Sequence, residues 1–308
     1  MKRTASQDRN RIKKRETSRV FLVALIGFGI LIVAVLLFLM AFFKRSWSEG
    51  SDRNILLIPE TINGYKGKIL FAHISPTNHK IDVVMLNPEL SLPVIGGYGD
   101  YPLRSIYPLW TLEKKDEKSL SSVYSFAMGK VIDDVWKSDR NNFDPENLSF
   151  KNVTQKLLFF KIASHLTLGD RLWLYRFTQG LRPDEVKVAY VDTLADWQKI
   201  QADSPFADQS KNCNFAVVNT ISVTGAGTRV GKMLENSGFS IVRITDQDQP
   251  ISTTELVLGD QAERCRDQQE HTLHAMPLHI KVVQDAARAQ EYRANMVLFI
   301  GSDLKPFF

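Results

Sequence analysis

The longest apolar pattern in the chain is an uninterrupted run over residues 20–43. As a helix rising about 1.5 Å per residue, it would be roughly 36 Å long, which is enough to cross a bilayer core. Residues 1–19 carry eight Lys or Arg against two acidic residues, and such an excess marks the cytoplasmic side. We therefore predict a cytoplasmic basic tail (1–19), a transmembrane helix (20–43) and a stalk (44–53), with everything beyond facing outward.

A cleaved signal peptide is the alternative interpretation of this segment. The apolar run is longer than the roughly 7–15 residues of a signal h-region, and no small-x-small cleavage site follows it. The sequence therefore favours an uncleaved signal-anchor, and hence a single-pass protein of the cell membrane with its later domains extracytoplasmic.

Shorter apolar runs follow the stalk and predict a first outward domain over 54–195. Runs bounded by turn residues predict strands at 55–58, 68–74, 81–86 and 186–191. Apolar residues at helical spacing predict helices over about 120–135, 153–164 and 167–176, the last opened by a capping box at Thr167 and Asp170. The glycine-rich stretch 93–102 predicts a surface loop.

A polar stretch at 196–212 is interpreted as a linker to a second domain. After it, strands are predicted at 215–218, 240–244, 255–258, 279–283 and 296–300, and helices at 225–237 and 261–271. Strands that alternate with helices indicate an α/β fold. The predicted fold class is thus an N-terminal single transmembrane helix followed by two extracytoplasmic α/β domains.

The charge balance argues against nucleic acid as a partner. The whole chain has a net charge of +5, and residues 1–19 alone contribute +6 (eight minus two), so the remainder is near neutral at −1. A neutral outward part lacks the basic surface that binds a phosphate backbone. The basic tail is better explained as a topology signal that also contacts anionic lipid.

The two cysteines, Cys213 and Cys265, both fall in the second domain. Outside the cytoplasm a disulfide is chemically permitted. It would close a loop of about 50 residues, worth about 4 kcal/mol in the chain-entropy model. Two separate buried thiols are the alternative, and the sequence leaves both open.

The motifs that could carry chemistry are weak. Gly225, Gly227 and Gly231 open a helix after a strand, but their spacing is one residue longer than the dinucleotide fingerprint. A tight turn that packs helix on strand is favoured, with anion binding at Gly225 and Gly227 as the alternative. His271 and His274 have no third ligand at a matching spacing, so no metal site is predicted. No catalytic residue is predicted either.

Residues 213–304 resemble the LytR C-terminal domain. The resemblance rests on Val217-Val218-Asn219-Thr220, Gly225 with the helix 230–237, Gly238-Phe239-Ser240-Ile241-Val242, Thr253 or Thr254, and the end Leu298-Phe299-Ile300-Gly301-Ser302-Asp303. This domain is found behind LytR/CpsA/Psr-type domains on the outer face of bacterial membrane proteins, so the resemblance implies an envelope location.

Residues 54 to about 140 resemble a degenerate LytR/CpsA/Psr (LCP) domain. The matching segments are Ile55–Ile58, Leu70–Ser75, Leu86-Asn87-Pro88-Glu89, Gly97-Tyr98-Gly99 with Tyr107, and Met128–Lys130 with Ile132-Asp133. The family moves lipid-pyrophosphate-linked polymers onto peptidoglycan, which requires arginines and a carboxylate-held Mg²⁺ around the pyrophosphate.

The residues expected to carry that chemistry depart from the family pattern. Tyr65 and Gly67 occupy its Arg-x-Asp positions, Glu89-Leu90 replaces Arg-Asp, and Arg104 stands where asparagine is expected. A carboxylate in place of an arginine would cost about 4 kcal/mol against a phosphate at about 4 Å. Lys66, Lys68 and Arg104 are the candidates for a different cationic, anion-binding pocket.

These observations predict a non-catalytic binding or assembly module for cell-wall polymer or an envelope partner. The alternatives are an LCP-type phosphotransferase that attaches lipid-pyrophosphate-linked glycopolymer to peptidoglycan, and an envelope sensor acting through the basic tail. No cofactor is expected, and Mg²⁺ only if the transferase alternative holds. The expected partners are the membrane and peptidoglycan, a polyprenyl-linked glycopolymer or another envelope protein.

Overall fold

The computed structural model describes residues 52–59, 68–113, 115, 119–138, 150–203, 213–265, 269, 272–273, 276 and 280–308. The predicted tail 1–19, the predicted span 20–43, most of the stalk and Lys66 lie outside these residues. Within the described part, no helix has the length and apolar character needed to cross a bilayer. The described residues fall into two units, a smaller one with Leu166–Trp173 and a larger one with the described residues of Ser48–His165 and Leu174–Phe308.

In the smaller unit, the described residues form the start of helix α5 (Leu168–Gly180). The Asp170 amide donates to the Thr167 hydroxyl at 3.2 Å, and the Thr167 amide donates to the Asp170 carboxylate at 3.2 Å. This reciprocal pair satisfies amide groups that a helix start leaves open. The predicted capping box is confirmed.

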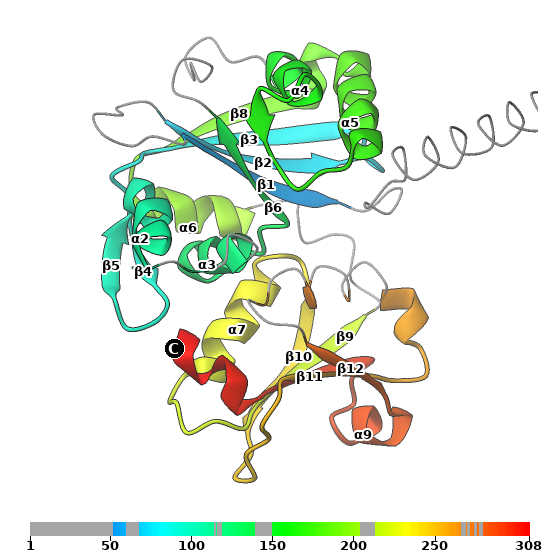
Figure 1. Cartoon of the computed structure of the whole chain (residues 1–308). Helices are drawn as coiled ribbons and strands as arrows, with labels where there is room; N and C mark the ends of the chain where they lie inside the picture. Colours follow the sequence, from blue (N-terminus) through cyan, green and yellow to red (C-terminus); the bar gives the residue numbers. More distant parts are fainter. Residues whose placement is uncertain are drawn as a thin grey trace, which may run out of the picture. The chain divides into compact units, whose positions relative to one another are not determined.

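The larger unit contains a six-stranded sheet in the order β7-β6-β1-β2-β3-β8 (Figure 1). Its strands are β1 (Arg53–Pro59), β2 (Ile69–Ser75), β3 (Lys80–Leu86), β6 (Asp134–Ser138), β7 (Ile162–Ala163) and β8 (Val186–Val191). Strands β1, β2 and β3 form an antiparallel meander, while β6 adds parallel to β1 and β8 parallel to β3. The four strands predicted in this region are confirmed.

The strand register divides the side chains between two faces of this sheet. Phe71 and Val84 are paired and lie in the main hydrophobic core, where the Phe71 ring meets Trp197 of α6 edge-on at 5.5 Å. Leu70 and Met85 are paired on the opposite face, as the period of two requires. The elements around the sheet are η1 (Leu103–Ser105), α2 (Ile106–Leu112), α3 (Leu120–Met128), α4 (Phe150–Leu158), η4 (Pro183–Glu185), α6 (Leu194–Asp203) and the hairpin β4 (Ser91–Val94) with β5 (Gly99–Pro102).

Four sequence predictions in this region were wrong in part. The helix expected over about 153–164 ends at Leu158, and residues 162–163 form strand β7. The helix expected over 120–135 ends at Met128, because Gly129 adopts a left-handed conformation (φ 64°), and Val135 lies in β6. The expected linker 196–212 begins inside α6, whose Trp197 is buried. The expected loop 93–102 forms most of the β4–β5 hairpin, with glycines at positive φ in its turn.

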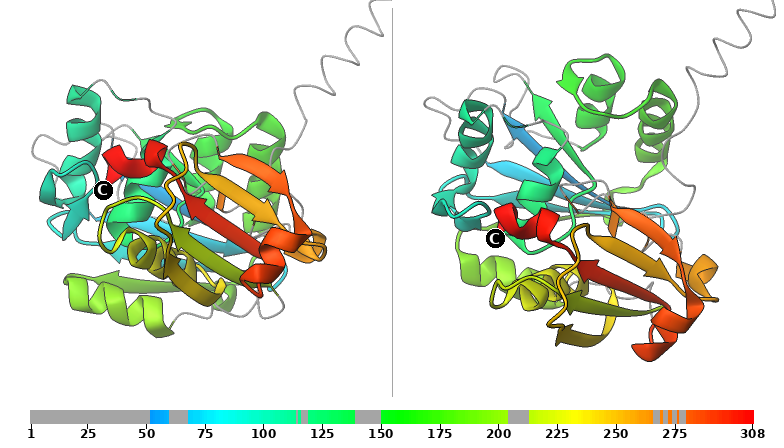
Figure 2. Two further views of the ribbon diagram at one scale, coloured as in Figure 1. Left: turned by 90° about the horizontal axis from the view of Figure 1, so that it is seen from below. Right: turned by 60° about the horizontal axis from the view of Figure 1, so that its bottom comes forward.

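The second sheet has five strands in the order β10-β9-β13-β11-β12 (Figure 2). They are β9 (Asn214–Asn219), β10 (Ser240–Asp246), β11 (Glu255–Leu258), β12 (Lys281–Gln284) and β13 (Met296–Ile300). Strands β10, β9 and β13 run parallel, and β11 is antiparallel to β13. All five predicted strands are confirmed, and so is the α/β fold class.

Helices cover both faces of this sheet. Helix α7 (Ala226–Glu235) packs with Phe215 and Val217 of β9, whereas α9 (Ala286–Glu291) packs with Ala216 and Val218 on the other face. The remaining described elements are η6 (Ala262–Cys265) and η7 (Ser302–Phe307). Helix α9 was not predicted, although Asp285 caps it by accepting a hydrogen bond from the Arg288 amide at 3.0 Å.

A polar joint links the ends of α3 and α7 within the larger unit. The Asn236 amide group donates to the Gly129 carbonyl at 2.8 Å, and the Val131 amide donates to the Ser237 hydroxyl at 2.7 Å. The Lys130 ammonium donates to the Asn236 carbonyl at 2.6 Å. These bonds satisfy the open polar groups of two helix ends at once, and the hydrophobic core continues on both sides of them.

Candidate functional site

The predicted cations of the first sheet are already paired with carboxylates. Arg104 Nε lies 2.7 Å from Glu89 Oε1, and the two side chains are 32% and 57% exposed. The Lys68 ammonium contacts the Asp192 carboxylate. The structure thus places two of the three predicted cationic residues in ion pairs, while Lys66 lies outside the described residues.

Both ion pairs flank the carboxyl end of β3. Leu86 ends this strand and pairs with Ile69 on one side and with Val191 on the other. Lys68 directly precedes Ile69 in the sequence, and Asp192 directly follows Val191. The Arg104 amide donates to the Pro88 carbonyl at 3.0 Å, which holds Arg104 beside the segment that follows β3. This edge of the sheet is therefore charged, but locally neutral.

A second charged cluster lies in the first sheet, where β1 and β2 meet the segment before β6, and its side chains are buried. Arg53 Nη1 is 3.6 Å from Asp133 Oδ1, and both side chains are 1% exposed. The Asn54 amide donates to the Asp133 carboxylate at 2.6 Å, and the Asn54 side-chain oxygen lies 2.8 Å from His73 Nδ1. The charges and polar groups of this cluster face one another in the interior, so these residues are assigned to the fold.

Burial shifts two pKa values in this region. Desolvation lowers the pKa of His73 below its ordinary value, although the hydrogen bond to Asp52 acts in the opposite direction. Desolvation also lowers the pKa of Lys130 to about 7, against the attraction of Asp133. The charged forms of both side chains are disfavoured because burial removes their hydration.

An apolar cavity of about 280 Å³ lies on the face of the first sheet that carries Leu70 and Met85. It is lined mainly by aliphatic side chains of β2, β3 and β8 and of the segment after α5, with two cations: Leu70, Val83, Met85, Phe150, Leu181, Pro183, Val186, Val188, Lys151 and Arg182. The volume lies just below the usual range of small-ligand pockets. Val188 on the edge strand is 51% exposed.

The second sheet carries a larger polar cleft of about 570 Å³ at the carboxyl ends of its three parallel strands. Its lining comes from the β9–α7 loop, the end of β10 and the start of η7: Asn219, Thr220, Ile221, Ser222, Val223, Thr224, Gly225, Asp246, Gln247, Asp248, Pro250, Ser302 and Lys305. Crevices outside the carboxyl ends of parallel strands are where α/β sheets bind ligands. We take this cleft as the candidate site.

One carboxylate of the cleft is held in a fixed position. The Asn219 amide nitrogen donates to Asp246 Oδ1 at 2.7 Å and to the Val223 carbonyl at 3.3 Å. Asn219 Oδ1 in turn accepts from the Ile221 amide at 3.2 Å. Because Asn219 is only 4% exposed, Asp246 is oriented by a buried, fully engaged amide.

The η7 wall of the cleft is also fixed. Asp303 accepts from the Thr254 hydroxyl at 2.6 Å and from the Thr254 amide at 2.9 Å. Gly301 approaches so closely that a Cβ atom there would lie 2.4 Å from the carbonyl carbon of Thr253. This contact requires glycine, and it sets the start of η7, with Ser302, against the sheet edge.

The predicted glycines have a packing role. Gly225 begins α7 at a positive φ of 79°, and a Cβ on Gly227 would lie 3.1 Å from Asn219 Cβ and 3.3 Å from Ile244. Gly227 therefore allows α7 to lie close against β9 and β10, whereas Gly225 supplies the positive φ before the helix and lines the cleft. Within the residues that the structure describes, no group of three His, Cys, Asp or Glu side chains is arranged to hold a metal ion.

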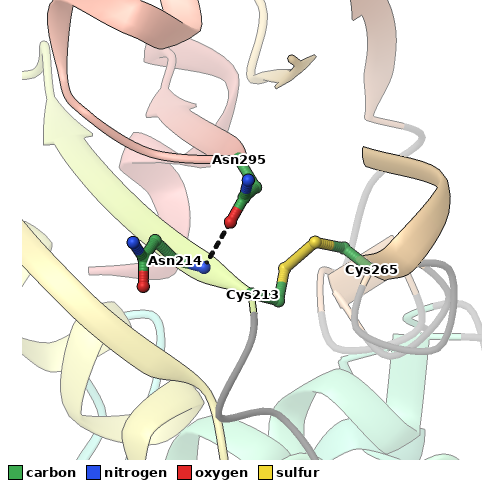
Figure 3. The surroundings of a disulfide bond; sticks show 4 residues. All are labelled: Cys213, Asn214, Cys265 and Asn295. Atoms are coloured by element: carbon green, nitrogen blue, oxygen red, sulfur yellow. Dashed lines mark hydrogen bonds between the residues drawn. A yellow bond between two sulfur atoms is a disulfide. The ribbon is translucent and has the colours of Figure 1, made fainter. Parts of the chain in front are cut away.

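A disulfide joins Cys213 to Cys265, with their Cα atoms 5.6 Å apart (Figure 3). Cys213 precedes β9, and the amide of the next residue, Asn214, donates to Asn295 Oδ1 at 2.7 Å. Cys265 ends η6. The bond therefore ties the η6 segment to the beginning of strand β9.

One known protein family matches the C-terminal part of this chain. Residues 213–304 match the LytR_C family, described as LytR cell envelope-related transcriptional attenuator, which confirms the resemblance found in the sequence. The cleft and the disulfide both lie within this match. No curated protein sequence matches the chain.

Solved structures share a partial likeness of fold with the chain. They include the transcriptional regulator yvhJ from Bacillus subtilis (8% identity, 47% of this chain and 84% of that chain, TM-score 0.35) and B. subtilis TagV (9%, 47% and 85%, 0.34). TagT bound to LI-WTA gives 7% identity over 49% of this chain and 82% of that chain, with a TM-score of 0.35. Likeness at this level carries no argument about activity.

Proposed function

We propose that this chain is a single-pass, membrane-anchored protein of the cell envelope whose outward domains bind envelope material without catalysis. The LytR_C match over residues 213–304 supports an envelope role, and the apolar run 20–43 supports the anchor. The outward part faces cell-wall polymer or another envelope protein in this proposal.

The observation that carries the non-catalytic role is the Arg104–Glu89 ion pair. A pyrophosphate requires unmatched cations or a bound divalent metal, because its charge must be offset in the transition state. Here the cation already has a carboxylate partner at 2.7 Å, and Lys68 is matched by Asp192 in the same way. A pyrophosphate at this edge would have to displace both carboxylates.

One observation favours a second candidate, an LCP-type phosphotransferase. The apolar cavity on the other face of the first sheet has Lys151 and Arg182 in its lining. Such a combination suits an apolar chain that ends in an anionic head group, although Arg182 already has a carboxylate partner, Glu185, at 3.0 Å. A transferase using this cavity would need a cation set different from the one at Arg104.

The experiment uses the full chain in detergent with polyprenyl-pyrophosphate-linked glycan, Mg²⁺ and purified cell-wall sacculi. We expect the chain to be retained on sacculi and no glycan to be transferred to them. The variant Glu89→Gln, which removes the carboxylate facing Arg104, should leave sacculus retention unchanged. Mg²⁺-dependent transfer by the unmodified chain would overturn the non-catalytic proposal, and absence of retention would overturn the binding role.

A further inference from the structure

The cleft at the carboxyl edge of the second sheet has the features of a binding site for a neutral, hydroxyl-rich ligand. Its volume of about 570 Å³ falls within the range of small-ligand sites. It is built from three segments that the fold holds rigidly, namely the β9–α7 loop, the end of β10 and the start of η7. A preformed cleft loses little conformational entropy when it binds.

The chemistry of the lining favours hydrogen bonding over charge pairing. Hydroxyl and amide side chains line the cleft together with two carboxylates and one ammonium group: Ser222, Thr224, Ser302, Gln247, Asp246, Asp248 and Lys305. Thr220 and Asn219 also border the cleft, but their polar groups are engaged within the fold. The formal charge of the cleft is therefore −1, two carboxylates against one lysine. A polyanion would be repelled, and a simple cation would leave the hydroxyl and amide groups unused.

Asp246 is the strongest acceptor in this arrangement. Asn219 holds one of its oxygens at 2.7 Å, so the carboxylate has a fixed direction and retains further acceptor capacity. Hydrogen bonds from a hydroxyl to a carboxylate are shorter and stronger than those between neutral groups. A pair of adjacent sugar hydroxyls matches the two oxygens of such a carboxylate.

Apolar side chains complete the match to a sugar. Ile221, Val223 and Pro250 line the same cleft, and the C–H faces of a pyranose ring can pack on such surfaces. Gln247 adds an acceptor, since its Oε1 atom is enclosed and has no hydrogen-bond partner among the described residues. A rotation of this side chain would present the oxygen to a bound hydroxyl.

We infer that the cleft at the carboxyl ends of β9, β10 and β13 binds a neutral oligosaccharide, with Asp246 as the principal acceptor. This inference rests on the proposed function and gives the second domain its own ligand class. The site is separate from the ion-paired edge of the first sheet.

The test titrates the full chain in detergent with N-acetylchitotetraose, followed by isothermal titration calorimetry and saturation-transfer NMR. We expect saturable binding that Asp246→Asn and Asp248→Asn each weaken at least tenfold. Asp260→Asn makes the same change at an exposed carboxylate outside the cleft, and it should leave the affinity unchanged. Absence of saturable binding, or equal affinity in all three variants, would overturn the inference.

Two further arms test the ligand class. Oligo(glycerol phosphate) and spermidine replace the sugar as an anionic and a cationic probe, and tighter binding of either one than of the sugar would overturn the choice of a neutral ligand. If Asp246→Asn lowers the melting temperature, the Asp248→Asn variant decides the result, because Asp248 is exposed.

The proposed function is tested separately by retention on sacculi. If N-acetylchitotetraose fails to bind but the chain is retained on sacculi, the cleft inference falls and the envelope-binding role stands. If the sugar binds through Asp246 but the chain is not retained on sacculi, the cleft inference stands and the proposed role falls.

Discussion

The two sheets of this chain present contrasting carboxyl edges. At the edge of β3 and β8, each predicted cationic side chain that the structure describes already has a carboxylate partner, as Arg104 has in Glu89. At the edge of β9, β10 and β13, the carboxylate of Asp246 is held by an amide and opens onto a cleft. The comparison teaches that a shared α/β architecture positions polar groups at strand ends, while their pairing decides whether a ligand can use them.

The largest effect should come from removing the disulfide of the region that contains the second sheet, residues 213–308. The variant Cys213→Ala with Cys265→Ala opens a bond between residues separated by 52 positions, for which chain entropy predicts a loss of about 4 kcal/mol. Chemical denaturation monitored by fluorescence would measure it. A loss below about 1 kcal/mol would mean that the bond does not restrain the unfolded chain, and the first region should show no change in its local hydrogen exchange.

Gly301→Ala should weaken the same region by about 3 kcal/mol, as expected for forced overpacking. The added Cβ would lie 2.4 Å from the carbonyl carbon and 2.5 Å from the amide nitrogen on either side of the Thr253–Thr254 bond, backbone atoms that cannot move aside cheaply. Gly180→Ala is the matched control, because no atom lies within 4 Å of its added Cβ. Equal melting temperatures for the two variants would contradict this account of the η7 wall.

Lys130, at the joint between the regions, should make stability depend on pH. Its pKa in the folded chain is about 7 against an ordinary 10.5, so between these values the unfolded chain binds more protons. Stability should therefore rise with pH across this window, by up to about 1.4 kcal/mol per pH unit. Denaturation curves of the unmodified chain and of Lys130→Met, compared from pH 7 to 10.5, would measure the difference. Parallel curves would show that Lys130 keeps an ordinary pKa.

The smallest effect concerns the Arg104–Glu89 pair. Both side chains are partly exposed, so a double-mutant cycle with Arg104→Gln and Glu89→Gln should give a coupling below about 1 kcal/mol. The more informative measurement is pyrophosphate binding, which Glu89→Gln should strengthen because it leaves Arg104 without its carboxylate. Unchanged pyrophosphate affinity would mean that the ion pair does not limit access to this edge, which would weaken the contrast with the cleft.

Much of the fold could be predicted because the strands are apolar runs bounded by turn residues. Helix limits were harder, since Val131 and Val135 continue the helical spacing of α3 even though Gly129 ends that helix. The sequence did contain a signal for α6 in the pair Thr193 and Asp196, which forms a capping box like that of α5. Composition alone made this stretch resemble a linker.

The sites could be predicted less well because their residues meet only through the fold. Lys68 and Asp192 are 124 positions apart, and they meet because β3 pairs with both β2 and β8. Asp246 lies at the end of β10, but the approach of Ser302 depends on the close contact at Gly301. Local patterns carry no information on such long-range pairings.

The joint at Gly129–Val131 bears on how modular this protein is. A family match begins at residue 213. Yet Asn236 and Ser237, at the end of α7 and inside that match, exchange hydrogen bonds with a segment more than 100 positions earlier. A gene fusion that transplanted the matched segment alone would leave a helix end without its partners and one side of the shared core exposed to solvent. The segment found by sequence matching is therefore smaller than the unit that folds. Recombination at the family boundary would lower the stability of the fold, and the sequence alone does not reveal this.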